Sequence, residues 1–177
     1  MARNMDSTVS QPETRTRADW LAPERVPDGE RPAHWDLLTE AASLTGRLEA
    51  RLGAPVEVER LSEHHDGDGA LRREVRLYAA GRPLVYAVSH IPSSLLQRLG
   101  WVASLGDQPL GSRLFASGEA VREGLTIARL AVDDPLVQRA WQGLDRNPAP
   151  LWARRSRLRV GGQAMVIVEC FLYGEQG

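Results

Sequence analysis

The sequence predicts an α+β protein built on a single six-stranded antiparallel sheet with helices packed over it. Six strand-like runs follow one another, a helix-like apolar stripe precedes them, and short helical segments are inserted between them. Strands that are joined by short turns pair in antiparallel fashion, because a parallel pair needs a long crossover connection. A chain of 177 residues is also long enough for one domain with a substantial core.

The first predicted element is a helix over residues 34–52. Its apolar residues recur at spacings of three and four, which is the period of one helix face. They are Leu37, Ala41, Leu44, Leu48 and Leu52. Gly53 and Pro55 predict where this helix ends. Residues 1–33 hold four prolines, many charges and few apolar side chains. We therefore expect a disordered tail there, followed by one domain at residues 34–177.

The strands follow the helix and are separated by turn signals. They are predicted at residues 56–61, 71–78, 84–91, 121–132, 152–160 and 164–173. Ala79-Ala-Gly-Arg-Pro83 predicts one hairpin connection, and Gly161-Gly162 predicts another more strongly. Gly124 predicts a β-bulge in the fourth strand.

Three shorter helices are predicted between the strands. They lie at residues 93–99, 110–115 and 135–144. The last has the clearest start, because Asp134 can cap its first turn and Pro135 suits the first helical position.

Composition narrows the function classes. The net charge is −1, so no general attraction to nucleic acid or to an anionic membrane is expected. All 22 basic residues are arginine, which excludes a mechanism that uses a Schiff-base lysine. The single cysteine, Cys170, fits a reducing compartment, and neither a membrane span nor a signal segment is evident. We expect a cytoplasmic monomer.

Two charged residues break the alternation of their strands. Glu169 lies in the apolar run Met165–Leu172, on the face of Ile167 and Phe171. Arg73 shares a face with the apolar residues of its own strand. The opposite face of that strand bears Arg72, Glu74 and Arg76, and we expect it to face solvent. A charge that faces a core needs a partner or a task. Either a structural Arg73–Glu169 ion pair or a buried site for a small anion explains the pattern.

Other polar clusters favour plainer interpretations. Arg155, Arg157 and Arg159 alternate on one strand and predict a solvated face, while Arg154 has the opposite parity. The histidines and aspartates of His64-His-Asp-Gly-Asp-Gly69 match no standard metal spacing, so no metal site is predicted. Cys170 is expected to be a buried, unreactive thiol.

Several segments, in order, resemble the chorismate lyase (chorismate–pyruvate lyase) family. They are Arg73-Glu-Val75 with Gly81-Arg-Pro83, Ile91-Pro92, Pro109-Leu-Gly-Ser-Arg-Leu-Phe115, Leu151-Trp-Ala-Arg-Arg-Ser156 and Val168-Glu-Cys-Phe-Leu172. The resemblance covers residues 71–173. It implies a six-stranded antiparallel sheet with helices over one face and an enclosed site under flap-like segments. It also implies conversion of chorismate to 4-hydroxybenzoate and pyruvate without metal or organic cofactor, as a step toward ubiquinone or another aromatic product.

The resemblance also implies roles for individual residues. Arg73 would bind the ring carboxylate together with the backbone of Leu110. Glu169 would lie near the 4-hydroxyl at the other end, and Leu44 would contact the ligand. Arg73 and Glu169 are the implied catalytic residues.

The sequence departs from the family at Val88. The family has an arginine at this position, four residues before Pro92, and that arginine is expected to bind the second carboxylate. We hypothesise that His90, on the same strand face as Val88, or an arginine of the Arg154-Arg155 pair replaces the lost cation. The segment 130–150 is longer than usual in the family and is expected to add a helix at the rim of the site.

Two main functions stay open at this stage. One is a lyase that acts on chorismate, and the other is a non-catalytic binder of a hydroxybenzoate-like acid. The second is open because the same fold serves as a sensing domain in some bacterial regulators. A family member with only a scaffold role is a third option. A DNA-binding regulator is disfavoured, because residues 1–33 are too few for a DNA-binding domain. The expected partner is a small molecule, not nucleic acid or membrane.

Overall fold

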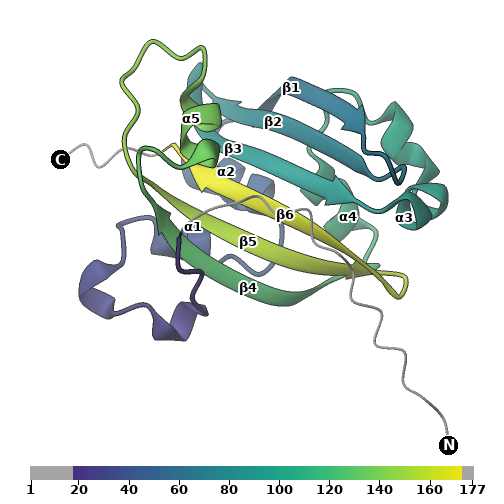
Figure 1. The fold of residues 1–177 in the computed structure, drawn as a ribbon, viewed down its shortest axis with the longest axis horizontal. Coiled ribbons are helices and arrows are strands. Elements are labelled where there is room, and N and C mark those ends of the chain that lie inside the picture. The colour runs from purple at the N-terminus through teal and green to yellow at the C-terminus, as the bar shows by residue number, and fades with distance from the viewer. Residues whose placement is uncertain (1–17, 173–177) are drawn as a thin grey trace, which may run out of the picture.

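The computed structural model describes residues 18–172 and contains one six-stranded antiparallel sheet (Figure 1). The strands are β1 (Glu57–His65), β2 (Leu71–Ala79), β3 (Arg82–Ile91), β4 (Ala120–Leu130), β5 (Leu151–Val160) and β6 (Gln163–Phe171). Their order in the sheet is β1-β2-β3-β6-β5-β4. The chain thus forms two three-stranded meanders that meet where β3 pairs with β6. The predicted fold class is confirmed.

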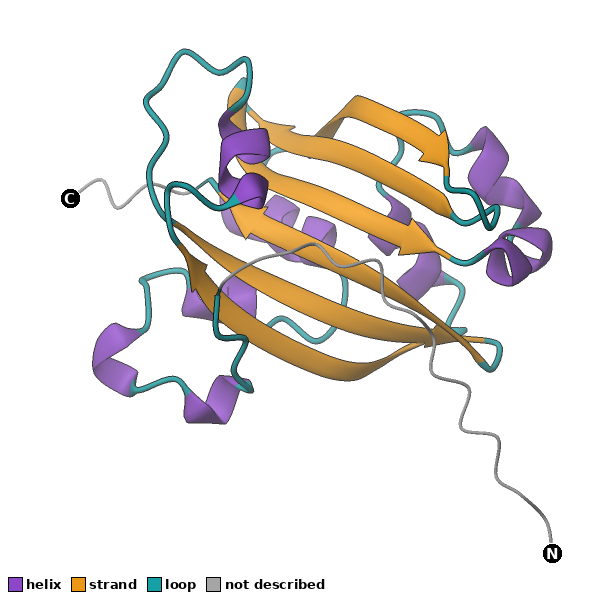
Figure 2. Cartoon of the chain, viewed as in Figure 1, coloured by secondary structure: helices purple, strands orange, loops and turns teal. Residues whose placement is uncertain are grey.

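Helices cover both faces of the sheet (Figure 2). They are α1 (Trp35–Leu38), α2 (Leu44–Leu52), α3 (Ser93–Arg98), α4 (Leu110–Ala116) and α5 (Pro135–Trp141), with 3-10 turns η1 (Pro23–Arg25), η2 (Asp28–Glu30) and η3 (Gly100–Ser104). The helices α1 to α4 and η3 pack on one face, in two apolar clusters. The helix α5 packs on the other face. None of the helices between residues 18 and 172 is long and apolar enough to cross a membrane.

Local sequence explains the turns that set the register of the sheet. The β2–β3 turn places Ala80 and Gly81 at φ values of 49° and 70°, and the β5–β6 turn places Gly161 and Gly162 at 55° and 86°. Two consecutive residues with positive φ twist in the sense that a tight hairpin requires. The register of β4 against β5 shifts between Arg122 and Gly124. Both predicted hairpins and the predicted bulge are therefore confirmed.

The single helix predicted over residues 34–52 is wrong, because the chain forms two helices there. The helix α1 ends at Leu38, and α2 starts at Leu44 after an N-cap in which the Ser43 hydroxyl accepts a hydrogen bond from the Gly46 amide at 3.2 Å. Ala41, a member of the predicted stripe, is exposed between them. The predicted end of α2 is confirmed, since Gly53 adopts the left-handed conformation that terminates helices.

The packed part of the chain begins earlier than the tail predicted over residues 1–33. Leu21 forms a two-hydrogen-bond bridge to Ile127 at the edge of the sheet, with N–O distances of 2.9 and 2.8 Å. Val26 is buried in the cluster that contains α1 and α2. Residues 18–33 therefore have defined structure. Residues 1–17 lie outside the described residues, and for them the tail stays a prediction.

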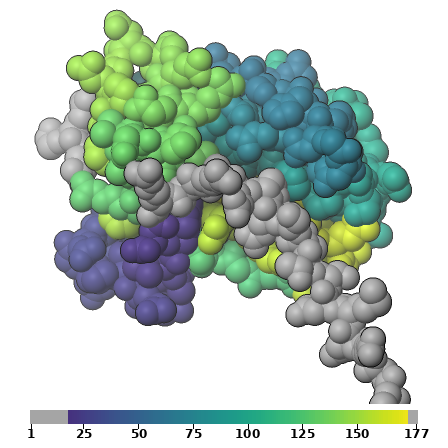
Figure 3. All heavy atoms as spheres, in the orientation of Figure 1, coloured from purple at the N-terminus to yellow at the C-terminus, as the bar shows by residue number. Residues whose placement is uncertain are grey.

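The face predicted to meet solvent at Arg72, Glu74 and Arg76 is covered instead. Glu74 is 6% exposed and Arg76 is 3% exposed. The helix α5 and the segment after it form a raised block over this side of the sheet (Figure 3). Arg139 of α5 donates from Nε to Glu74 at 2.7 Å, and Arg76 donates from Nη2 to the Gln142 carbonyl at 2.8 Å. The segment 130–150 thus adds the expected helix, but this helix covers a second core on this face of the sheet, so the expectation that it lies at the rim of the site is wrong.

Candidate active site

A pocket lies between the sheet and the helices α2 and α4, on the face opposite α5. Its unfilled space is about 590 Å³, including solvent at the mouth. Leu44, Val75, Leu110 and Ile167 belong to its apolar wall. Four charged side chains from four different strands also line it, and they are Arg73, Arg122, Arg154 and Glu169. An apolar pocket with a few convergent charges is the usual form of a small-molecule site.

Arg73 is held from two sides at one end of the pocket. It is 2% exposed. Its Nη1 donates to Glu63 Oε2 at 2.5 Å, and Glu63 is its direct partner on the edge strand β1. Its Nη2 donates to the Gly106 carbonyl at 2.6 Å. The arginine therefore fixes the loop that leads into α4, where Leu110 begins the helix.

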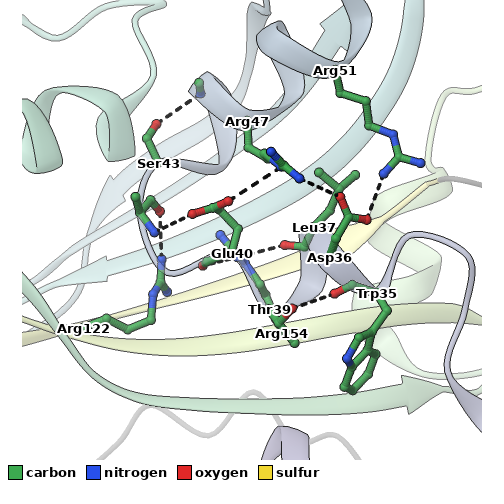
Figure 4. A network of polar contacts seen from close by, with 12 residues as sticks. Trp35, Asp36, Leu37, Thr39, Glu40, Ser43, Arg47, Arg51, Arg122 and Arg154 are labelled. Carbon is green, nitrogen blue, oxygen red and sulfur yellow. Dashed lines mark hydrogen bonds and ion pairs between the residues drawn. The ribbon is translucent and has the colours of Figure 1, made fainter. Parts of the chain in front are cut away.

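Glu169 is paired with Arg154, its direct partner on β5. Arg154 Nε donates to Glu169 Oε2 at 2.5 Å. The Arg154 side chain is 1% exposed, and its Nη1 also donates to the carbonyls of Leu37 and Glu40, each at 3.0 Å (Figure 4). The ion pair considered between Arg73 and Glu169 is therefore not formed, because each of them has a nearer partner. Both side chains nevertheless line the same pocket, as the alternative interpretation predicted.

Arg122 is a third cation in the pocket that sequence reasoning missed. It comes from the edge strand β4 and reaches back over β5, where Nη1 donates to the Ser156 hydroxyl. Its Nε and Nη2 donate to the carbonyls of Ala41 and Ala42 at 3.2 and 3.3 Å (Figure 4). Burial and the nearby Arg154 cation lower the pKa of Arg122 to about 10. Within residues 18–172, it forms no ion pair with a carboxylate.

Leu44 and Leu110 line the pocket, as the resemblance implied. Leu44 is the first residue of α2, directly after the Ser43 cap, and Leu110 is the first residue of α4. The Ser43 and Ser112 hydroxyls lie 3.2 Å apart and connect the starts of the two helices. The two residues predicted to contact the ligand therefore lie at the starts of two helices that are connected to each other beside the pocket.

His90 and Val88 do not reach the pocket. Ala87 and Ser89 line it, so the alternation of β3 points Val88 and His90 to the opposite face. Val88 is buried in the cluster around α5. His90 lies near Asp66, with Nε2 3.4 Å from Oδ2. The hypothesis that His90 replaces the family's arginine is thus not supported by its position. The loss of an arginine at Val88 also removes no cation from the pocket face.

Of the arginine pair proposed as a replacement, only the first member faces the pocket. Arg154 lines it, whereas the guanidinium of Arg155 lies 4.8 Å from the ring of Trp20 on the other side of the sheet. Arg157 and Arg159 are exposed and pair with Glu123, as expected for a solvated face.

Cys170 and the four histidines do not line the pocket. In the described part of the chain, no group of three or more His, Cys, Asp and Glu side chains is placed to hold a metal ion. Cys170 is buried in the cluster around α5, and burial raises the pKa of its thiol. A thiol that is held protonated is a poor nucleophile.

The fold and this pocket define a small α+β protein with a cationic, partly apolar pocket between its sheet and its helices. The family profile described as "Chorismate lyase" matches residues 14–176. A Halorhodospira halophila protein named "Probable chorismate pyruvate-lyase" is 41% identical over 163 residues, which cover 82% of this chain and 84% of that protein. An Azoarcus sp. protein of the same name is 37% identical over 174 residues, which cover 86% and 89%. The chain belongs to the chorismate lyase family.

Proposed function

We propose that this protein is a chorismate pyruvate-lyase, which converts chorismate to 4-hydroxybenzoate and pyruvate. One observation supports this more than any other. Arg73 and Glu169, the two residues that the family resemblance selects, line one pocket although they come from different meanders. Family membership and the names of the two relatives support the same activity.

Arg73 is suited to bind the ring carboxylate. Its guanidinium has five N–H donors, and the bonds to Glu63 and Gly106 occupy only part of them. At 2% exposure, a charge-assisted hydrogen bond from this arginine is little weakened by water. The backbone at Leu110 borders the same end of the pocket and would complete the carboxylate site.

The reaction is an elimination that needs a proton acceptor at ring carbon C4. The C3–O ether bond breaks, the C4 hydrogen leaves as a proton, and its electron pair completes the aromatic ring. The released enolpyruvate takes up a proton at its methylene carbon and becomes pyruvate. The reaction is redox-neutral and consumes no net protons, so we propose no cofactor.

Glu169 is the proposed acceptor of the C4 proton. Arg154 donates to Oε2 and thereby restrains the orientation of the carboxylate, and Oε1 is the oxygen that would accept the proton. A positioned carboxylate typically accelerates a proton transfer by about 10²- to 10⁴-fold. The apolar wall that includes Leu44, Val75 and Ile167 excludes water around the ring and holds it in place.

A direct assay separates this function from simple binding of an aromatic acid. Purified protein is incubated with chorismate, while pyruvate is followed by a coupled dehydrogenase and the aromatic product by its ultraviolet absorbance. Stoichiometric release of pyruvate and 4-hydroxybenzoate is expected. Micromolar binding of 4-hydroxybenzoate in calorimetry without any turnover would instead favour a binding protein. Release of 3-hydroxybenzoate would overturn the proposed product.

We further propose that the protein works as a cytoplasmic monomer with a small-molecule substrate. The net charge of −1 offers no general attraction to nucleic acid. Size-exclusion chromatography with light scattering tests the oligomeric state. A mass close to 19.5 kDa is expected, and twice that mass would contradict the monomer.

A further inference from the structure

We propose that Arg122 binds the second carboxylate of the substrate, that of the enolpyruvyl group, and so distinguishes the dianionic substrate from the monoanionic product. This inference rests on the proposed function and assigns one more residue to the same site. Neither the sequence patterns nor the family resemblance pointed to Arg122.

The charge balance of the pocket favours this assignment. Arg73 is neutralised by Glu63, and Arg154 is neutralised by Glu169. Arg122 contributes a further positive charge that no ion pair in the described residues balances. Arg122 is only partly buried, but even partial removal of a charge from water is unfavourable unless a counter-ion offsets it, and a bound carboxylate would do so. A ligand with two carboxylates would bring an anion to Arg73 and another to Arg122.

The position of Arg122 matches the shape of the substrate. Glu169 lies on β6, and the Arg122 guanidinium lies over the neighbouring strand β5, because it donates to Ser156 there. Adjacent strands are about 4.8 Å apart. The enolpyruvyl ether is attached at C3, next to the C4 atom that Glu169 is proposed to contact. A carboxylate on that side chain would therefore reach over β5 when the ring carboxylate is held by Arg73 on β2.

Arg122 is better placed for this task than Arg154. Arg154 is 1% exposed and already satisfies Glu169 and two carbonyls. Arg122 donates only to neutral acceptors, and its bonds to Ala41 and Ala42 are long, at 3.2 and 3.3 Å. A carboxylate forms shorter and stronger hydrogen bonds than a carbonyl, so it would compete successfully for the same guanidinium.

The lowered pKa of Arg122 fits the same interpretation. Burial and the Arg154 cation both disfavour its charged form, and only Glu169 and Glu40 oppose them. With a pKa of about 10 the guanidinium is still charged at neutral pH. An incoming anion would relieve the unfavourable potential, which adds to the affinity for a second carboxylate.

Binding at Arg122 would also act on the segment between α1 and α2. Arg122 donates to the carbonyls of Ala41 and Ala42, and the same segment leads into Leu44, which lines the pocket. A carboxylate at Arg122 would share or replace those bonds. The site would therefore respond to the second carboxylate with a local rearrangement of residues 39–43.

The test compares two ligands and two variants by calorimetry. The dicarboxylate probe is 3-(carboxymethoxy)-4-hydroxybenzoate, which places an ether-linked carboxylate beside a 4-hydroxyl. The monocarboxylate is 4-hydroxybenzoate. Arg122→Gln should weaken the dicarboxylate by about 10- to 100-fold and 4-hydroxybenzoate by less than about 3-fold. The control Arg157→Gln changes an exposed arginine on β5 that faces away from the pocket, and it should alter neither affinity.

Two outcomes of the binding comparison would overturn the role proposed for Arg122. Equal weakening of both ligands in Arg122→Gln would overturn the proposal, because it would indicate a general structural role. Unchanged affinity for the dicarboxylate would overturn it as well. If Arg122→Gln does not fold, Arg122→Lys provides the test. It keeps the charge but loses the planar fork, so the preference of the wild-type protein for the dicarboxylate should shrink without disappearing. A full wild-type preference in Arg122→Lys would overturn the proposal that the Arg122 guanidinium recognises the second carboxylate.

The binding comparison tests Arg122 independently of whether the protein is a lyase. If the wild-type protein does not turn over chorismate, the lyase proposal fails, yet the two-ligand comparison still tests Arg122. If turnover is present, kcat/KM for chorismate should fall in Arg122→Gln by a factor similar to that for the dicarboxylate. Turnover with an intact kcat/KM would remove Arg122 from the substrate site and leave the lyase activity standing.

Discussion

Both faces of the sheet bury arginines and glutamates, but they do so in different ways. On the α5 face, Glu74 accepts hydrogen bonds from Arg139 at 2.7 Å, Tyr86 at 3.0 Å and Arg72 at 3.1 Å. Apolar side chains of α5 fill the surrounding space. On the other face, the charged side chains border a pocket, and Arg122 has no carboxylate partner in the described residues.

The comparison teaches that a buried charge does not identify a site by itself. Glu74 is as deeply buried as many catalytic groups, yet its neighbours satisfy it fully. Burial alone would raise the pKa of Glu74, but hydrogen bonds from Arg139, Tyr86 and Arg72 outweigh it and hold the pKa below its ordinary value of 4.5. A pocket that borders a cation without a carboxylate partner is a better indication of a ligand site than burial of a charge alone.

The largest effect on activity is expected from Glu169→Gln, a change on the pocket face. The change removes the proposed proton acceptor, so kcat should fall by about 10²- to 10⁴-fold. The fold should be kept, because glutamine is nearly isosteric and can still accept a hydrogen bond from Arg154. Steady-state kinetics with chorismate and a far-ultraviolet dichroism spectrum measure both effects. A kcat within tenfold of the wild type would break the assignment of Glu169.

Arg73→Ala should abolish the carboxylate clamp on the pocket face. We expect the affinity for 4-hydroxybenzoate to fall by about 100-fold, because truncating one partner of a buried charged contact typically costs several kcal/mol. Calorimetry measures the change. Arg82→Ala, at an exposed arginine in the β2–β3 hairpin, is the matched control and should bind normally. Unchanged affinity in Arg73→Ala would show that the ring carboxylate binds elsewhere.

Glu74→Gln should lower stability but leave catalysis nearly unchanged, the opposite of what is expected for Glu169→Gln. It leaves Arg139 and Arg72 without a charged partner, so the free energy of unfolding should fall by about 1–3 kcal/mol. Catalysis should stay within about threefold of the wild type, because the pocket lies across the sheet. Urea denaturation and the lyase assay together measure this. A variant with normal stability and lost activity would contradict the division between the two faces.

Acid should lower the stability of the folded protein through Glu74 on the α5 face, by less than the Glu74→Gln substitution does. The folded-state pKa of Glu74 lies below its ordinary value of 4.5, so the folded protein binds fewer protons at this group than the unfolded chain does. Its contribution to stability is thus complete above that value and declines as the pH falls through the lower, folded-state pKa. Melting temperatures between pH 3 and 6 should show a steeper acid decline for the wild type than for Glu74→Gln. Parallel curves would contradict this role of Glu74.

Local sequence patterns predicted much of the fold. Strand alternation, the glycines of the hairpins, Gly53 at the end of α2 and the Asp134 cap of α5 depend only on neighbouring residues. All of them are present in the structure. The break after α1 is different, because the spacing of Leu37, Ala41 and Leu44 suits a continuous helix. The carbonyls of this segment are bound by Arg122 and Arg154 from distant strands, and such tertiary contacts override helical periodicity.

The candidate site could be predicted only in part, because strand alternation is local whereas the pairing of strands is not. Parity identified Arg73 and Glu169 as charges that face a core, but their partners depend on which strands are neighbours. The covering of Glu74 depends on where α5 folds back, which no local pattern states. Arg122 lies opposite Leu158, a residue of the pocket face, but β4 and β5 are joined through α5 and not by a tight turn, so no local pattern sets this pairing.

The junction between β3 and β6 has a consequence for how the two halves of the sheet are held together. These strands are far apart in the sequence, and they join the two meanders of the sheet. The pocket lies across that junction, with Arg73 on one side and Glu169 on the other. A ligand that contacts both residues makes separation of the meanders more costly. Bound 4-hydroxybenzoate should therefore slow amide hydrogen exchange in both halves together, far beyond the residues that it touches.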